Sequence, residues 1–237
     1  MIVHQCIQGS EEWLALRLGV VTASEFSDII TPAKLELSKS ATKYMCRKLA
    51  EWMLGAPLEQ FTSGWMERGT NLEPEAVRYY EMERDVETSA IGFVTTDDGT
   101  VGCSPDRGIS DDGLLELKCP ALETHAAYML DPASLVQEYS LQTQGQLWVC
   151  SDRAYCDVMS YYPGFPAVIV RTHLREKVKD ALALHIPAFV QAMLKCRERL
   201  TQEYGELRRE RVTAQQRTEA SHAAFDEFMS SGIGGAV

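Results

Sequence analysis

The sequence lacks the features that mark membrane-spanning, secreted and metal-cluster proteins. No apolar run approaches the roughly 18 residues that a transmembrane helix requires. The first residues, MIVHQCIQGSEEW, contain neither the basic nor the apolar region of a signal peptide. The seven cysteines form no C-x-x-C pair, which argues against a disulfide framework and against zinc or iron–sulfur ligation. We therefore expect a cytoplasmic protein with reduced thiols.

An excess of positive charge is also missing. The chain carries 34 acidic and 23 basic residues, for a formal net charge of −11. Because nucleic-acid-binding domains usually carry a basic surface, contact with DNA would require a local basic patch or bound cations. The 237 residues, of which 45% are hydrophobic, suit one sizeable globular domain.

Hydrophobic periodicity and turn residues divide the chain into helical and extended parts. Between 91 and 119, apolar runs alternate with DDG turns, which predicts a three-stranded meander. Proline and glycine predict an interruption near Gly69 and Pro74, and a kink at Pro187. Strands are expected over 155–162 and 167–174, and helices over 10–21, 22–30, 38–55, 63–83, 133–149 and 174–203.

This order of elements predicts an α/β fold with a mixed central sheet flanked by helices. Residues 1–204 are expected to form the domain. Residues 205–237 are strongly charged and then rich in small residues, so we expect a helical extension and a flexible tail. The tail is a candidate region for recruiting a partner protein.

The segment CSPDRGISDDGLLELKCP places charged residues in an apolar strand. Glu116 and Lys118 are two residues apart and share one face of this strand, while the turn brings Asp106 close to them. Two carboxylates held this close repel each other, and a hard divalent cation such as Mg²⁺ would remove the conflict. The main-chain carbonyl of Leu117 is a further candidate ligand. Lys118 could orient or deprotonate the attacking water, or stabilise charge on a phosphate.

Each part of this pattern is ordinary by itself. Glu-x-Lys on a strand usually belongs to a solvated face, and Pro-Asp is common before a turn. The combination of Pro-Asp, about ten residues and Glu-Leu-Lys resembles the PD-(D/E)XK nuclease motif, which implies a restriction-endonuclease-like core.

Four segments resemble the bacteriophage lambda exonuclease family, also called YqaJ-type viral recombinases. They are WLALRLGVVTAS at 13–24, GCSPD at 102–106, LELKCP at 115–120 and LQTQGQLWV at 141–149. The resemblance extends over about residues 8–200. It implies a Mg²⁺-dependent exonuclease, with Mn²⁺ as a possible substitute, that degrades one strand of duplex DNA from a 5′-phosphorylated end. It also implies a ring-shaped homotrimer, and a 3′ single strand left for recombination with a single-strand annealing protein. A phage or prophage gene would place the protein in the host bacterial cytoplasm.

The resemblance assigns residues to the catalytic site. Asp106, Glu116 and the Leu117 carbonyl match the metal ligands, and Lys118 matches the catalytic lysine. Glu73 matches a helical glutamate that completes the metal site, although Glu67 and Glu75 are close alternatives. Gln142 matches a helical glutamine near the metals, with Gln144 and Gln146 as the alternatives in register.

A second set of residues matches the family's pocket for the 5′-phosphate. Arg17 offers the planar fork that suits a phosphate, and Ser24 lies at a helix start, where free N–H groups attract anions. The family has a further basic residue in the next loop, where this chain has Lys34. A lysine supplies a point charge but no bidentate contact.

Two other functions remain open. An endonuclease on the same core, of restriction or CRISPR-associated type, would cut closed circular duplex, which an exonuclease leaves intact. A non-catalytic DNA-end-binding or annealing accessory would have a decayed motif, whereas Asp106, Glu116 and Lys118 are all present. A monomer is the alternative to the ring.

Overall fold

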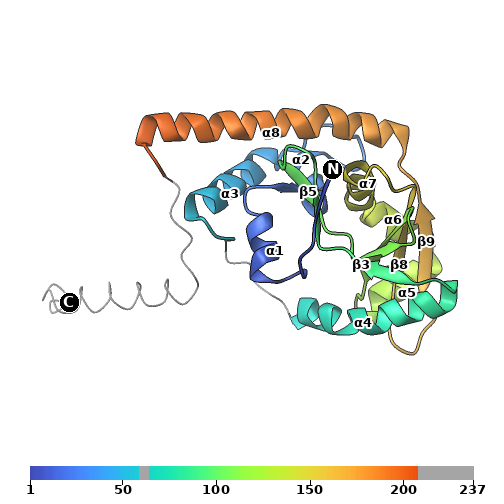
Figure 1. Ribbon diagram of the computed structural model, residues 1–237. Coiled ribbons are helices and arrows are strands. Elements are labelled where there is room, and N and C mark those ends of the chain that lie inside the picture. Colours follow the sequence, from blue (N-terminus) through green and yellow to red (C-terminus); the bar gives the residue numbers. More distant parts are fainter. Residues whose placement is uncertain (59–63, 208–237) are drawn as a thin grey trace, which may run out of the picture.

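The strands in the described part of the chain form two separate sheets (Figure 1). The computed structural model describes residues 1–58 and 64–207, without the side chains of 64–68 and 70. The first sheet has the order β1-β4-β5-β2, formed by Ile2–His4, Phe93–Thr95, Val101–Cys103 and Val21–Thr22. The second has the order β3-β6-β7-β8-β9, formed by Thr88–Ala90, Arg107–Ile109, Gly113–Lys118, Tyr155–Ser160 and Val168–Thr172.

The second sheet is mixed, and β7 lies at its centre. Strand β6 pairs with β7 antiparallel, whereas β8 pairs with it parallel, with Lys118 opposite Ser160. The α/β fold class with a mixed sheet is thereby confirmed.

The expected meander over 91–119 is wrong in one respect, because the chain changes sheet within it. Strand β5 pairs with β4 in the first sheet, and β6 pairs with β7 in the second. The crossing occurs at Ser104–Asp106. Pro105 has no N–H to donate to a ladder, so the strand ends there. Asp106 consequently lies at the junction of the two sheets.

Helices cover the sheets and surround their junction. α1 begins after the Ser10 cap, whose hydroxyl accepts from the Trp13 N–H, and α3 ends at left-handed Gly55. The helices are α1 Glu11–Leu16, α2 Phe26–Ile29, α3 Ala41–Leu54, α4 Gly64–Arg84, α5 Leu122–Leu130, α6 Pro132–Glu138, α7 Ser140–Val149 and α8 Glu176–Tyr204, with a 3-10 turn, η1, at Ala23–Glu25.

Several expected helix limits are wrong. α4 continues through Pro74, because burial of Ala76 and Tyr80 against the second sheet offsets the hydrogen bond that proline cannot donate. The segment 133–149 is divided into α6 and α7 at Tyr139, and α5 was not expected. Pro187 lies inside α8.

The two faces of β7 contact two different apolar clusters. Leu114 belongs to the larger cluster, which includes residues of α7 and α8, whereas Leu115 and Leu117 pack against Ala76 and Tyr80 of α4. Both faces are covered by helices, so the charges on β7 lie inside the protein, as the apolar sequence around them predicts.

Polar contacts fix α4 against the second sheet. The Tyr80 hydroxyl donates to Oδ2 of fully buried Asp157 at 2.7 Å, and Arg171 binds the same carboxylate with two hydrogen bonds. Near the other end of the sheet, the Tyr161 hydroxyl donates to Glu75 at 2.6 Å. α4 therefore has a defined position relative to β7 and β8.

A close approach between helices positions α7. A Cβ atom at Gly145 would lie 2.6 Å from the Phe26 ring, so only glycine permits α7 to pack this tightly against α2. α8 then runs along α2, α3 and α7 (Figure 1).

The C-terminal limit of α8 at Tyr204 coincides with the expected end of the domain. Residues 208–237, which contain most of the expected extension and tail, lie outside the described residues. No helix in the described part of the chain is long and apolar enough to cross a membrane.

Candidate functional site

The carboxylate of Asp106 meets the C-terminal half of β7. Its Oδ2 accepts a hydrogen bond from the Leu117 N–H at 2.6 Å. The main-chain N–H and C=O of one strand residue point in the same direction, so the Leu117 carbonyl also faces the side on which Asp106 lies. The next carbonyl, that of Lys118, points to the opposite side of the strand, where it accepts a hydrogen bond from the Tyr161 N–H. This alternation is the one that a β-strand requires.

The Glu116 carboxylate is the most enclosed charge of the site, with 2% of the residue exposed. Oε1 accepts from Lys118 Nζ at 2.6 Å and from Gln142 Nε2, and Oε2 accepts from Gln146 Nε2 at 2.6 Å. Gln142 and Gln146 are four residues apart on α7 and so share one face of the helix. Burial of a carboxylate without hydrogen-bond partners is unfavourable, and here three donors bind the Glu116 carboxylate.

Gln144 points away from this site. Its amide donates to the Thr172 hydroxyl at 3.2 Å and to the His173 carbonyl at 2.9 Å, and its oxygen accepts from the Arg175 N–H at 2.7 Å. Of the three glutamines, the structure thus brings Gln142 and Gln146 to Glu116. The sequence predicts Gln146 only as an alternative in register, although its i, i+4 spacing from Gln142 places both side chains on one face of the helix.

Lys118 lies between Glu116, Gln142 and an aromatic ring. Its Nζ is 3.4 Å from Gln142 Oε1 and 4.5 Å from the centre of the Tyr139 ring. Burial by itself would lower the pKa of Lys118, but the charges of Glu116 and Asp106 outweigh it, so the pKa lies above its ordinary value. Lys118 is therefore an ammonium ion in the metal-free protein.

Two carboxyl groups of the site, those of Asp106 and Glu73, have raised pKa values. Burial is the largest cause of the raised pKa of Asp106, followed by the charge of Glu116, while Lys118 and the Leu117 N–H oppose the shift. The pKa of Glu73 is raised for the same two reasons, burial and then Glu116. Glu73 lies on α4, which packs on the Leu115 and Leu117 face of β7.

These groups form an all-oxygen donor set with unfavourable mutual repulsion, which suits a hard divalent cation. Within residues 1–58 and 64–207, however, no three His, Cys, Asp or Glu side chains are grouped closely enough to hold a metal ion. A cation here would therefore depend on the Leu117 carbonyl and on water in addition to carboxylates, both of which Mg²⁺ accepts.

Arg17 lines a cavity between α1 and α3. Its guanidinium lies 4.2 Å from the centre of the Trp13 ring and 5.7 Å from that of Phe93. Trp13 Nε1 in turn donates to the Ser104 hydroxyl at 2.8 Å, two residues before Asp106. The cavity has a volume of about 270 Å³ and is lined by Trp13, Leu14, Arg17, Leu18, Glu25, Lys48, Glu51, Pro57 and Leu58.

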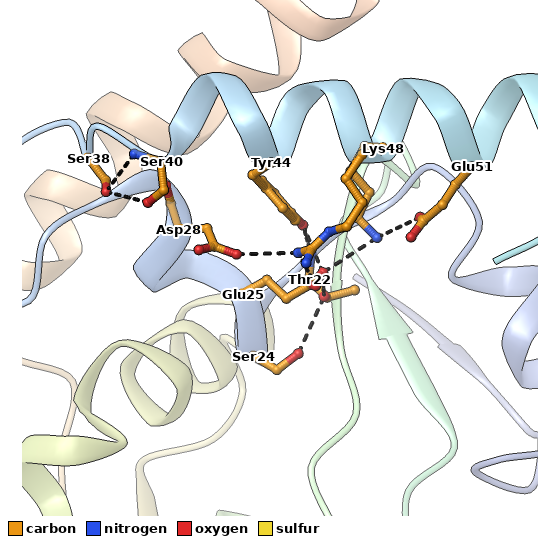
Figure 2. A network of polar contacts seen from close by, with 10 residues as sticks. Thr22, Ser24, Glu25, Asp28, Ser38, Ser40, Tyr44, Lys48 and Glu51 are labelled. Carbon is orange, nitrogen blue, oxygen red and sulfur yellow. Dashed lines mark hydrogen bonds and ion pairs between the residues drawn. The ribbon is translucent and has the colours of Figure 1, made fainter. Parts of the chain in front are cut away.

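Three residues that line this cavity, Glu25, Lys48 and Glu51, belong to a network of polar contacts (Figure 2). Lys48 contacts Glu51 at 2.9 Å and Glu25 at 3.4 Å, and Arg47 binds Glu25 as well. Arg17, in contrast, has no ion-pair partner among the described residues, and burial lowers the pKa of its guanidinium. Arg17 is thus the cation of this cavity that remains available to an anion.

The other two residues expected in the phosphate pocket do not line the cavity with Arg17. Ser24 lies exposed on η1, with its hydroxyl 3.4 Å from that of Thr22 (Figure 2). Lys34 is exposed in the turn after α2 and does not line the cavity. Lys48 lines it instead. Lys48 could not be predicted from the sequence, because it lies on α3, 24 positions after Ser24 in the chain. No local sequence pattern indicates a contact over that separation.

Comparisons with known proteins agree on one relationship. The model of the YqaJ-like viral recombinase domain matches residues 12–153, more than half of the chain. The crystal structure of an alkaline exonuclease, LHK-Exo, from Laribacter hongkongensis is 30% identical, with a TM-score of 0.73, and the match covers 84% of this chain and 100% of that one. LHK-Exo in complex with dAMP matches at 30% identity and a TM-score of 0.74, over 84% of this chain and 100% of that chain.

A phage-related exonuclease from Haemophilus somnus 129PT shares the fold. It is 14% identical, with a TM-score of 0.61, and the match covers 78% of this chain and 96% of that one. No curated protein sequence matches the chain.

Proposed function

Since the chain belongs to the YqaJ-like viral recombinase family and has the PD-(D/E)XK fold, we propose that it is a metal-dependent exonuclease acting 5′ to 3′ on ends of double-stranded DNA. The observation that carries the proposal is the convergence of Asp106, Glu116, Lys118 and Gln142 around the end of β7. The 3′ single strand left behind would serve recombination with a single-strand annealing protein.

The residues that would hold the cation are Asp106, Glu116 and the Leu117 carbonyl, with Glu73 as a further candidate from α4. Mg²⁺, or Mn²⁺ in its place, would supply positive charge that stabilises the transition state of phosphodiester hydrolysis. Its positive charge would also lower the pKa values of Asp106 and Glu73, which burial and then the charge of Glu116 raise.

Lys118 and Gln142 are the groups that would act on the reacting atoms. The Lys118 side chain would orient or help deprotonate the attacking water, or stabilise the negative charge that develops on the phosphate. In the metal-free protein it carries a proton, because its pKa lies above its ordinary value. Gln142 holds Lys118 and Glu116 together and presents its amide beside them.

The cavity at Arg17 would bind the 5′-phosphate of the DNA end, whereas Ser24 and Lys34 do not line this cavity and would have to approach the phosphate from outside it. Arg17 is supported by its position and by its lack of an ion pair within the described residues. The hydrogen bond from Trp13 to Ser104 links this cavity to the chain segment that carries Asp106. LHK-Exo, the relative solved with dAMP, binds a nucleoside monophosphate of the kind that an exonuclease releases.

A ring-shaped homotrimer around the DNA product would reconcile the net charge of −11 with DNA binding, provided that the ring is acidic outside and basic inside.

Time-resolved digestion of a linear duplex labelled at its 5′ or 3′ ends tests the proposal. We expect release of label from 5′-phosphorylated ends in Mg²⁺, no release in EDTA, and no cutting of closed circular duplex. Cleavage of the circle would indicate an endonuclease, and absence of cleavage in Mg²⁺ and in Mn²⁺ would indicate a non-catalytic protein.

A further inference from the structure

Gln146 makes the deepest contact of the site, and the proposed function does not use it. The residue is 1% exposed, and its Nε2 donates to Glu116 Oε2 at 2.6 Å. The contacts on the other oxygen come from less enclosed side chains, since Lys118 is 21% exposed and Gln142 is half-buried. Oε2 of Glu116 therefore faces the interior, and Oε1 faces the opening of the site.

The orientation of the Gln146 amide follows from its neighbours. A carboxylate accepts hydrogen bonds only, so the side of the amide that faces Glu116 must be the NH₂ group. On the other side, the Cys156 thiol donates to Gln146 Oε1 at 3.9 Å, a weak contact that agrees with this orientation. The pairing between Gln146 and Glu116 is therefore defined in one direction.

We propose that Gln146 is a positioning residue that fixes the Glu116 carboxylate for a divalent cation. By holding Oε2 from the interior side, it prevents rotation of the carboxylate and so fixes the position of both oxygens. This inference rests on the proposed function, because it assumes that Glu116 is a ligand. Groups that orient a ligand in this way typically contribute about 10- to 100-fold to metal affinity.

The chain offers a matched control for a test. Gln144 lies on the same helix, is equally buried and also makes hydrogen bonds through its amide, but its partners lie on β9 and at the start of α8. Gln146→Met and Gln144→Met remove the same group from similar surroundings. Only the first removes it from Glu116.

Isothermal titration of each full-length protein with MnCl₂, in the absence of DNA, measures the affinity directly. We expect Gln146→Met to raise the Kd for Mn²⁺ about 10-fold or more, and Gln144→Met to keep the wild-type Kd. Near-ultraviolet circular dichroism and a cooperative thermal transition establish that each variant is folded. If Gln146→Met does not fold, Gln146→Asn, which keeps a polar amide too short to reach Oε2, replaces it, with Gln144→Asn as its control.

A second readout separates positioning from general damage. In DNA digestion at increasing Mn²⁺ concentration, Gln146→Met should require more metal for half-maximal rate but approach the wild-type maximum. Suppose that the wild-type protein binds Mn²⁺ and digests DNA, and that the Kd of Gln146→Met is unchanged or lower. This result would overturn the role of Gln146 and leave the proposed function intact. Failure of the wild-type protein to bind Mn²⁺ would overturn both.

Discussion

Replacing Lys118 with methionine should separate cleavage from metal binding, and should also destabilise the metal-free protein. The Lys118 ammonium lies 2.6 Å from Glu116 Oε1, and its charge opposes the raised pKa of Asp106. Methionine keeps much of the apolar stem and removes the charge. In the absence of metal, the variant therefore leaves two neighbouring carboxylates without their closest cation.

The size of this destabilisation follows from the burial of the pair. Two unit charges about 4 Å apart interact by about 4 kcal/mol at the effective dielectric near a protein surface. Removing one partner of a fully buried pair costs about 3–5 kcal/mol. The Lys118 side chain is 21% exposed and Gln142 and Gln146 still donate to Glu116, so we expect a loss of about 2 kcal/mol. For a domain of this size, that loss lowers the Tm by about 4–8 °C.

Calorimetry with EDTA and with Mg²⁺, combined with digestion of 5′-phosphorylated linear duplex, measures both effects. Mg²⁺ should raise the Tm of Lys118→Met more than that of the wild type, because a bound cation replaces the missing charge. Cleavage should fall by about 10²- to 10⁴-fold, the usual contribution of a group that assists proton transfer or charge stabilisation. Lys179→Met, which removes a half-exposed lysine of α8 paired with Glu176, serves as the control. Wild-type cleavage by Lys118→Met, or an unchanged Tm without metal, would refute the reasoning.

Three further substitutions test other parts of the structure. Arg17→Met should make digestion rates on 5′-phosphorylated and 5′-hydroxyl ends equal, whereas a persisting preference would exclude Arg17 from phosphate recognition. Burial raises the pKa of Glu25, but Lys48 and Arg47 outweigh burial and hold the pKa below its ordinary value. The Glu25 carboxylate therefore stabilises the fold above about pH 4.3, the ordinary pKa of a glutamate. This stabilisation is lost as the pH falls through the lower pKa of the folded state. In urea denaturation, Glu25→Gln should therefore cost about 1–2 kcal/mol at pH 7 and little at about pH 3, and a cost independent of pH would contradict the pairing. Tyr80→Phe should lower the free energy of unfolding by about 1–3 kcal/mol, because buried Asp157 loses a donor, and an unchanged midpoint would show that the contact contributes nothing.

The local geometry around β7 could be predicted because it depends on short sequence separations. Residues two apart on a strand share a face, and the turn at 110–113 returns the chain beside Asp106. The proximity of Asp106, Glu116 and Lys118 follows from these two facts alone. The α/β class followed in the same way from the order of helical and extended segments.

Features that depend on how distant elements pack could not be predicted. The division of the strands between two sheets depends on which partners β5 and β6 select, and Pro105 marks the break only once those partners are known. Burial of Glu116 results from α7 covering its face of β7. The presence of Lys48 beside Arg17 likewise requires α3 to pack near α1, which no periodicity in either segment indicates.

A crystal of the protein grown with Mn²⁺ and measured at the manganese absorption edge tests the central claim most directly. We predict an anomalous peak within coordination distance of Asp106, Glu116 and the Leu117 carbonyl oxygen. A peak elsewhere, or none at Mn²⁺ concentrations that support digestion of DNA by the same protein, would contradict the proposed metal site.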